Sequence, residues 1–316
     1  MIKVVEMYYK QGLSQVEIGQ QLNVSRTTVS RVLTRARKEG YVEIKINYPE
    51  GTVVSKEKRL EKKFHLKEAS IAYSQPGEKI EDEVGFYAAD YLLRILRNHM
   101  TIAMCRGNTL FKMVSCLSND MRLKFMKLKD INVVTLMAAT NLPVDATREE
   151  RLIYSNFLID EVGRILNGRT YHLLAPQYVE NAEMKQHFMS EKSVKETLNI
   201  AMHADAAIMG IGSVDEHSAM VRSGLLDEKQ FEDLHIKGGV GELLSHIIDR
   251  NGDLIQDDFE NRVISLDLDD LMKIPIRVGV ACGMNKKDSI LSVLKKEYIN
   301  VLITDDEVAD YLLSVE

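Results

Sequence analysis

Cationic and hydroxyl side chains recur at helical spacing near the N-terminus of this 316-residue chain, over residues 26–38. An arginine can donate two hydrogen bonds to guanine, and serine or threonine hydroxyls can reach bases or phosphates. This combination is typical of a surface that reads double-stranded DNA. The residues that we predict to contact DNA are Arg26, Thr27, Thr28, Ser30, Arg31, Thr34 and Lys38.

A second group of polar residues follows short apolar runs further along the chain, where a small ligand could bind. One of these turns opens a helix, where unpaired backbone N–H groups and the helix dipole favour an anion. Others place a cation near a glycine-rich turn and a lysine at a strand-to-helix turn. A further one is the glycine-rich stretch 238–242, which we predict to be a flexible loop that ends in a carboxylate. Each turn alone is equally compatible with a plain connection. The predicted ligand-binding residues are Gly107, Asn108, Thr109, Arg222, Glu242 and Lys286.

Local signals place the first group on the second helix of a helix-turn-helix. Ser14 and Glu17 form a predicted capping box, and Asn23 suits the tight turn that follows. Ser25 then caps a helix that runs to about Lys38 and has a cationic face opposite its apolar face. A recognition helix enters the major groove in this arrangement. A helical hairpin with a solvated polar face is the alternative.

The DNA-binding head is predicted to span residues 1–50 and to end in a strand at 42–46, which closes it and could form a wing. A highly charged linker helix is expected over residues 51–67. Its apolar side chains form a narrow seam that either pairs with a second copy or packs on its own domain. The seam consists of Val53, Leu60 and Phe64.

Charge is unevenly distributed, although the whole chain carries a net charge of −6. Residues 1–63 hold 13 Lys and Arg against 7 Asp and Glu, which leaves 28 against 40 for the remainder. Basic charge therefore concentrates in the N-terminal part. This is expected if that part alone meets a polyanion such as nucleic acid.

From residue 68 to residue 316, short apolar runs alternate with helical stretches. This alternation predicts an α/β domain with a Rossmann-like, doubly wound parallel sheet that helices cover on both faces. Ligands of such sheets bind beyond the carboxyl ends of the strands, where the second group of polar residues falls. The predicted strands are residues 101–105, 131–137, 171–175, 206–211, 277–282 and 301–304.

Several protein classes are disfavoured by what the sequence lacks. No apolar run approaches the roughly 18 residues of a membrane span, and early charges interrupt any secretory signal, so we expect a cytoplasmic protein without a membrane partner. The widely spaced cysteines indicate neither a disulfide framework nor a zinc site. Because Gly210 and Gly212 lack a third glycine and no GxxxxGK[ST] occurs, no nucleotide or other cofactor is predicted.

The stretch LSQVEIGQQLNVSRTTVSRVLTRARKEGYVEI is followed in order by GIGSV, RSGLL, KGGVGELL and VGVACGMNKKDSI. With these motifs the whole chain resembles the SorC/DeoR-type family of sugar-binding transcriptional regulators. The resemblance implies a DNA-binding head joined to an effector domain similar to ribose-5-phosphate isomerase and CoA-transferase subunits. It also implies a homo-oligomer, as a dimer of dimers, with a double-stranded DNA operator and a sugar or sugar phosphate as partners.

The resemblance assigns phosphate contacts to Lys286 and Arg222 and hydroxyl contacts to Glu242. The family's Trp-Gly-Thr-Thr motif is altered here at residues 106–109, so that only the glycine and the last threonine carry over. Met137 stands in the stretch where some members have a Schiff-base lysine, which disfavours a deoxyribose phosphate. A cysteine also replaces the first glycine of the usual pair ahead of Asn285 and Lys286, which narrows the expected pocket.

An enzyme is the main alternative, namely a sugar-phosphate isomerase or CoA-transferase-like protein fused to a DNA-binding head, with Glu242 as base or nucleophile. Acid–base catalysis normally needs a partner group, and the sequence offers no second carboxylate or histidine in a recognisable motif. We therefore predict a regulator without catalytic or metal-binding residues. RNA binding is disfavoured because no aromatic residues interleave with the basic ones of the predicted recognition helix.

Overall fold

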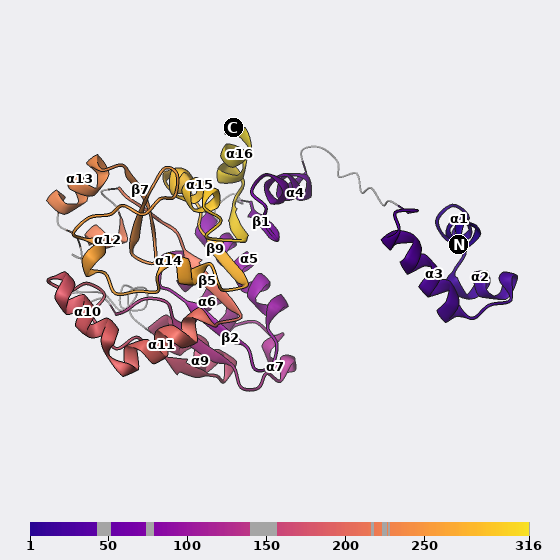
Figure 1. The fold of residues 1–316 in the computed structure, drawn as a ribbon, viewed down its shortest axis with the longest axis horizontal. Coiled ribbons are helices and arrows are strands. Elements are labelled where there is room, and N and C mark those ends of the chain that lie inside the picture. Colours follow the sequence, from indigo (N-terminus) through magenta and orange to yellow (C-terminus); the bar gives the residue numbers. More distant parts are fainter. Residues whose placement is uncertain are drawn as a thin grey trace. The chain divides into compact units, whose positions relative to one another are not determined.

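The computed structural model forms two compact units, Met1–Glu50 and Gly51–Glu316 (Figure 1). Within the described residues, no helix combines the length and the apolar composition that crossing a membrane requires. Most of the strand predicted at 42–46 lies outside the described residues. The structure describes residues 1–42, 52–73, 79–139, 157–215, 218–222, 226 and 228–315.

The first unit contains helices α1 (Ile2–Tyr9), α2 (Gln15–Leu22) and α3 (Arg26–Lys38). The predicted capping box of α2 is present, with Ser14 and Glu17 bonding each other's backbone N–H groups. These bonds satisfy N–H groups that have no partner inside the helix. The helix-turn-helix predicted from the caps is therefore the observed local structure.

The turn between α2 and α3 brings backbone segments very close together. Asn23 takes the left-handed conformation that the turn needs, at φ 54°. A Cβ atom on Gly19 would lie 2.7 Å from the carbonyl oxygen of Val24. The close approach explains a glycine in the middle of α2, where it costs the isolated helix up to about 1 kcal/mol. The core of this unit consists of Val4, Met7, Ile18, Val29 and Leu33.

The second unit is built on a parallel sheet, seven-stranded within the described residues. This confirms the predicted α/β class. The strand predicted at 171–175 begins and ends earlier than expected, because Leu173 and Ala175 instead join a separate buried cluster. In spatial order the strands are β1 (Glu68–Ala72), β10 (Val301–Asp305), β9 (Ile276–Val280), β5 (Ala206–Gly210), β2 (Thr101–Met104), β3 (Asn132–Thr135) and β4 (Arg169–Tyr171).

Helices pack on this sheet in contiguous groups. In one group α5 (Ile80–Ile95) contacts α6 (Asn108–Ser118), which contacts α9 (Phe157–Leu166). In another, α4 (Val53–Lys63) contacts α16 (Asp306–Ser314), which contacts α15 (Lys287–Lys295). The other described helices are α7 (Leu123–Met126), α10 (Ala182–Ser190), α11 (Lys192–Met202), α12 (Ala219–Arg222), α13 (Glu228–Ile236), η1 (Glu260–Arg262), α14 (Leu268–Leu271) and η2 (Met284–Lys286).

A small antiparallel sheet begins one residue after β5 and comprises β6 (Gly212–Ser213), β7 (Gly239–Leu243) and β8 (His246–Asp249). The prediction of a flexible loop at 238–242 is therefore wrong. A Cβ on Gly241 would lie 2.9 Å from the Cβ of Ser289, so β7 needs glycine to pack against α15. Tight packing, and not flexibility, accounts for the glycine-rich sequence.

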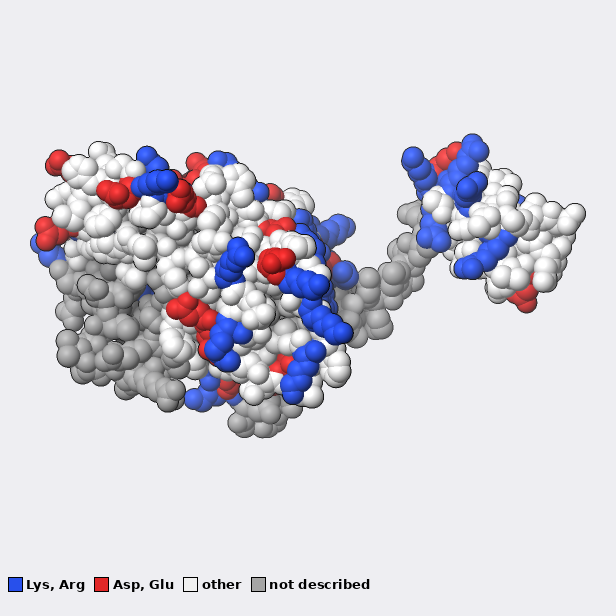
Figure 2. Space-filling model, turned by 90° about the horizontal axis from the view of Figure 1, so that it is seen from below, with Lys and Arg blue, Asp and Glu red and all other residues white. Residues whose placement is uncertain are grey.

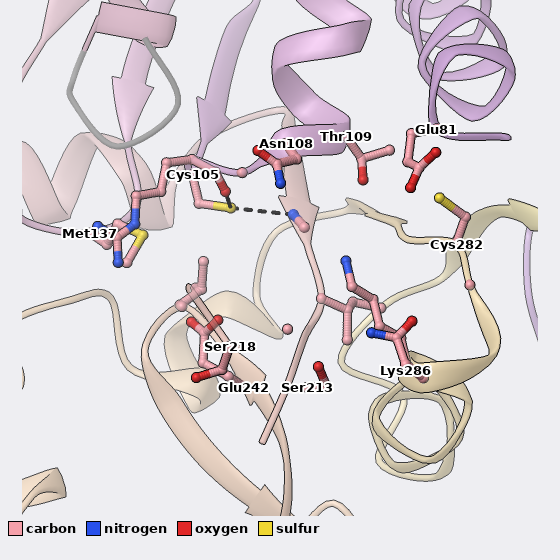
Figure 3. Close-up of a pocket in the computed structure, with 18 residues that line it drawn as sticks. Glu81, Cys105, Asn108, Thr109, Met137, Ser213, Ser218, Glu242, Cys282 and Lys286 are labelled. Atoms are coloured by element: carbon pink, nitrogen blue, oxygen red, sulfur yellow. Dashed lines mark hydrogen bonds between the residues drawn. The ribbon is translucent and has the colours of Figure 1, made fainter. Parts of the chain in front are cut away.

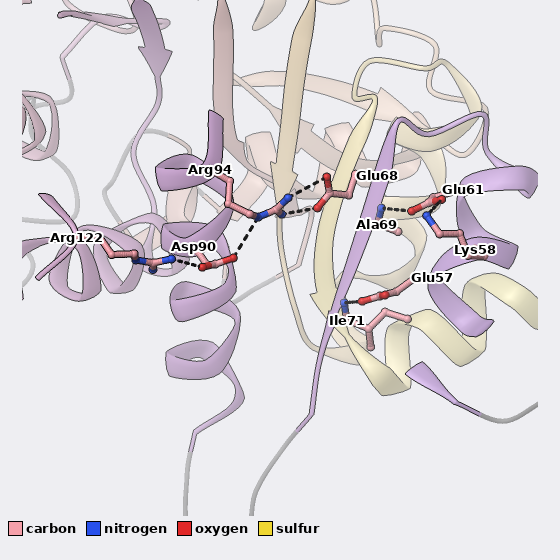
Figure 4. Close-up of polar contacts among 9 residues, drawn as sticks. All are labelled: Glu57, Lys58, Glu61, Glu68, Ala69, Ile71, Asp90, Arg94 and Arg122. Atoms are coloured by element: carbon pink, nitrogen blue, oxygen red, sulfur yellow. Dashed lines mark hydrogen bonds and ion pairs between the residues drawn. The ribbon is translucent and has the colours of Figure 1, made fainter. Parts of the chain in front are cut away.

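Helix α4 packs on β1, at the edge of the parallel sheet. Leu60 is fully buried, and Val53 and Phe64 pack against the same core. The apolar seam therefore packs on its own domain, which confirms that alternative. Carboxylates of α4 also accept hydrogen bonds from the outer N–H groups of β1, as Figure 4 shows. An edge strand left uncovered would expose those groups to other chains.

We expect Leu60→Ala to lower the free energy of unfolding by about 2–5 kcal/mol, because it empties a fully buried site between α4 and the sheet. Urea denaturation followed by circular dichroism measures this. Val54→Ala on the same helix is the control, since Val54 is 45% exposed. Equal effects of the two substitutions would contradict the packing of α4.

Candidate functional site

A cavity of about 320 Å³ opens at the carboxyl ends of β2, β5 and β9 (Figure 3). The strand order reverses between β2 and β5, because β3 and β4 follow β2 on one side while β9 and β10 follow β5 on the other. Open α/β sheets bind ligands at such switch points. Three segments that follow these strands line the cavity, at residues 105–109, 210–213 and 282–286.

One side of the cavity is suited to an anion. Helix α6 begins at Asn108 after Gly107, and among the described residues no side chain caps it. Its first-turn N–H groups and its dipole therefore favour negative charge at this end. Lys286 is half-buried at the start of α15 and extends into the cavity, in which Thr109 also lies (Figure 3).

The other side presents a fixed carboxylate. Glu242 on β7 accepts a 2.5 Å hydrogen bond at Oε1 from the backbone N–H of Ser245, in the turn between β7 and β8. A Cβ on Gly212 would lie 2.5 Å from Oε2 of the same carboxylate. The glycine therefore makes the room in which Glu242 lies, and the turn fixes its orientation. The remaining lone pairs can accept hydrogen bonds from ligand hydroxyls.

The structure brings together five of the six ligand-binding residues predicted from the sequence. The side chain of Arg222 lies outside the described residues, and only its backbone position at the end of α12 is described. Met137 also lines the cavity and offers it a thioether. The five predicted residues in the cavity wall are Gly107, Asn108, Thr109, Glu242 and Lys286.

Sequence reasoning missed several residues of the wall, above all the second carboxylate of Glu81. This residue lies in the first turn of α5, which precedes β2 in the chain, so no strand-end pattern points to it. Figure 3 shows Glu81 and Glu242 on different sides of the cavity. Within the described part of the chain, no group of three or more His, Cys, Asp or Glu is arranged to hold a metal ion.

Two thiols form part of the wall. The Sγ atom of Cys105 accepts a 3.3 Å hydrogen bond from the N–H of Gly210, which ties the end of β2 to the end of β5. Burial raises the pKa of Cys105 and of Cys282 to about 12. Both side chains therefore stay protonated near neutral pH and act as small apolar or weakly polar surfaces.

The second candidate surface is the outer face of α3. Arg26, Arg31 and Lys38 are exposed there, and none of their side chains has a hydrogen bond or ion pair with another described residue. Hydroxyls of Thr27 and Thr28 bond to Ser25 at the helix start. Thr34 bonds the carbonyl of Ser30 and is exposed. Figure 2 shows Lys and Arg outnumbering Asp and Glu on this unit, whereas both signs mix on the larger one.

Comparison with known protein families gives a match to each unit. A family model described as a putative sugar-binding domain matches residues 50–314. A model of region 4 of sigma-70 matches residues 3–39, which contain the helix-turn-helix.

Known regulators resemble the chain over nearly its whole length. The transcriptional regulator LsrR of Escherichia coli K12 is 28% identical over 315 residues, which are 98% of this chain and 93% of LsrR. The crystal structure of the full-length sorbitol operon regulator SorC of Klebsiella pneumoniae is 26% identical, with a TM-score of 0.71 over 99% of this chain and 97% of SorC. The crystal structure of a domain of a Vibrio fischeri transcriptional repressor, described as a putative sugar-binding domain, is 27% identical, with a TM-score of 0.72 over 82% of this chain and 98% of that domain.

We expect the cavity thiols of Cys105 and Cys282 to resist alkylation in the native protein at pH 8. A pKa of about 12 leaves on the order of one thiolate in 10,000, so reaction should be on the order of 1,000-fold slower than in the denatured chain. Peptide mass spectrometry after iodoacetamide treatment measures each site. Rates like those in guanidinium chloride would show that these thiols are not buried.

Proposed function

The chain belongs to the sugar-binding-domain family of transcriptional regulators, and we propose that a phosphorylated sugar in its cavity controls how tightly its head binds operator DNA. The protein is a DNA-binding transcriptional regulator with a sugar-binding domain. The proposal adds the phosphate, the residues that bind it and the control of a carbohydrate-utilisation operon.

A single observation carries this proposal, namely the opposed chemistry of the two sides of one cavity. The first turn of α6 and the ammonium of Lys286 supply hydrogen-bond donors and positive charge on one side, where the carboxylate of Glu81 also lies. The Glu242 carboxylate, held by the turn at Ser245, supplies acceptors on the other side. A sugar phosphate has a matching polarity, with an anion at one end and hydroxyl donors along its length.

The DNA operator is proposed to be read by α3 inserted in the major groove. In support, the cations of Arg26, Arg31 and Lys38 are exposed and the hydroxyls of Thr27 and Thr28 lie at its N-terminal end. Such heads usually act in pairs on a pseudo-palindrome, so we propose a homo-oligomer, as a dimer of dimers. An operator as partner implies action in the cytoplasm.

We propose that the cavity binds its ligand without converting it. Glu81 and Glu242 give it two carboxylates, which an isomerase or CoA-transferase-like enzyme could use as acid and base. The relatives over the whole chain are transcriptional regulators, which favours a sensor. To test this, the purified protein is incubated with the sugar phosphates that it binds, and the products are analysed. More moles of product than of protein would overturn the proposal.

We expect Arg31→Ala to weaken binding to the operator by about 1–3 kcal/mol, and to relax selectivity at one base pair, because alanine cannot make the bidentate hydrogen bonds to a base. Fluorescence anisotropy measures it on a duplex that the wild-type protein selects from a random library. Arg37→Gln is the control, since Nε of Arg37 bonds the hydroxyl of Tyr9 in α1. Unchanged affinity in Arg31→Ala would contradict the insertion of α3 in the major groove.

We expect Lys286→Ala to raise the concentration of sugar phosphate needed to change operator binding by about 10- to 150-fold. This corresponds to a charge-assisted hydrogen bond of about 1.5–3 kcal/mol. Binding to DNA without ligand should stay near the wild-type value. The ligand is the sugar phosphate that gives the largest thermal shift in a panel of free and phosphorylated sugars.

Lys287→Ala is the matched control for this measurement. Lys287 is the next residue in the chain, but its ammonium lies 4.9 Å from the ring centre of Tyr311. It does not belong to the cavity wall. Equal midpoints for Lys286→Ala and Lys287→Ala would show that Lys286 does not bind the ligand. A panel in which only unphosphorylated sugars shift the melting temperature would show that the ligand carries no phosphate.

A further inference from the structure

Half of the net positive charge of residues 1–63 lies outside the DNA-binding head. Residues 1–50 hold 8 Lys and Arg against 5 Asp and Glu, and residues 51–63 hold 5 against 2. Each stretch thus has an excess of +3. The second stretch is α4, a helix of 11 residues that belongs to the effector domain.

Both acidic side chains of α4 are turned toward the sheet. Oε1 of Glu57 accepts a 3.1 Å hydrogen bond from the N–H of Ile71, and Oε1 of Glu61 accepts a 3.2 Å bond from the N–H of Ala69 (Figure 4). Both carboxylates of the helix therefore cover the outer edge of β1, and Glu61 also pairs with Lys58. The outward face of α4 keeps its cations.

The cations of α4 divide into those that hold the helix and those that face solvent. Lys56 pairs with Asp310, and Lys63 bonds the carbonyl of Val315, so both fasten α4 to the C-terminal segment. Arg59 and Lys62 are exposed, and neither has a hydrogen bond or ion pair with another described residue. The exposed ammonium of Lys58 lies beside them, although it also pairs with Glu61 at 2.6 Å.

We propose that this outward face, made of Lys58, Arg59 and Lys62, binds the phosphate backbone of the DNA that the head holds. The three cations lie within about 100° around the helix, since Arg59 and Lys62 follow Lys58 by 1 and 4 residues. Two of the three, Arg59 and Lys62, have no ion pair or hydrogen bond with another described residue, and a compact positive face of this kind matches a polyanion. Backbone contacts of this kind add affinity and fix register without reading sequence.

The position of α4 in the chain favours DNA over other polyanions. Fourteen residues separate the end of α3 at Lys38 from the start of α4 at Val53. Once the head is bound, a connection of this length keeps α4 at a high effective concentration near the same duplex. The α4 face can therefore add to the DNA affinity of the whole protein even if it binds DNA only weakly by itself.

The test is the salt dependence of DNA binding by the full-length protein. We expect the double variant Arg59→Gln and Lys62→Gln to lower the slope of log affinity against log salt by about 2, since each phosphate that the protein neutralises adds about 0.9 to that slope. Glutamine keeps the helix propensity. Anisotropy titrations on the library-selected duplex, from low to moderate potassium chloride, give the slope for wild type and variant.

The matched control removes the same number of charges from another part of the same domain. Lys124 and Lys127 are exposed at α7, which Figure 1 shows away from α4, and neither side chain is bonded to another described residue. We expect Lys124→Gln with Lys127→Gln to leave the slope unchanged. An unchanged slope in the α4 variant, or an equal fall in both variants, would overturn the proposal.

A further measurement separates backbone contact from base recognition. Neutralising the α4 face should weaken binding to preferred and scrambled duplexes by the same factor, because phosphate contacts carry no sequence information. A loss confined to the preferred duplex would overturn the assignment to the phosphate backbone. The result does not depend on the sugar phosphate, so failure here leaves the proposed ligand untouched.

Discussion

Strands β2 and β5 pair in parallel, from Ile102 with Ala206 to Met104 with Ile208, yet the chain continues from them toward opposite edges of the sheet. Parallel crossovers are right-handed, so this reversal sends the following helices to opposite faces and leaves a crevice above the two strands. The cavity lies in that crevice. The α6 N-terminus, the end of β5 and the turn before α15 converge there because of the reversal.

The small antiparallel sheet supplies the carboxylate on the other side of the cavity. One residue, Ile211, separates the end of β5 from β6, so the parallel sheet leads almost directly into the sheet that carries Glu242. Behind the turn that holds this carboxylate, His246 is buried and bonds Glu260 at 2.9 Å. Burial alone would lower the pKa of His246, but the hydrogen bond and charge of Glu260 outweigh it and raise that pKa. A paired buried charge is costly to disturb, so this contact anchors the sheet behind the cavity.

Sequence patterns predicted the features that local chemistry determines. The caps at Ser14 and Ser25 follow from short-range hydrogen bonding, and the strand ends follow from apolar runs that stop at polar turns. The failures have tertiary causes. Strand β7 looked like a loop because its glycines make room for Ser289, which belongs to a helix far along the chain. Glu81 was missed because only the folded sheet brings α5 to the cavity. The sequence could not decide what the apolar seam of α4 packs against, because that depends on β1 being an edge strand of the sheet.

The same opposed chemistry limits how strongly a ligand can regulate the head. A ligand shifts an equilibrium only by the difference in its binding free energy between the two states of the protein. One charge-assisted hydrogen bond, such as that proposed for Lys286, accounts for about 1.5–3 kcal/mol. Typical allosteric coupling is about 1–3 kcal/mol. A conformational change that made or broke this one bond would therefore suffice for regulation, while the Glu242 side could bind the sugar equally in both states and supply affinity without a signal.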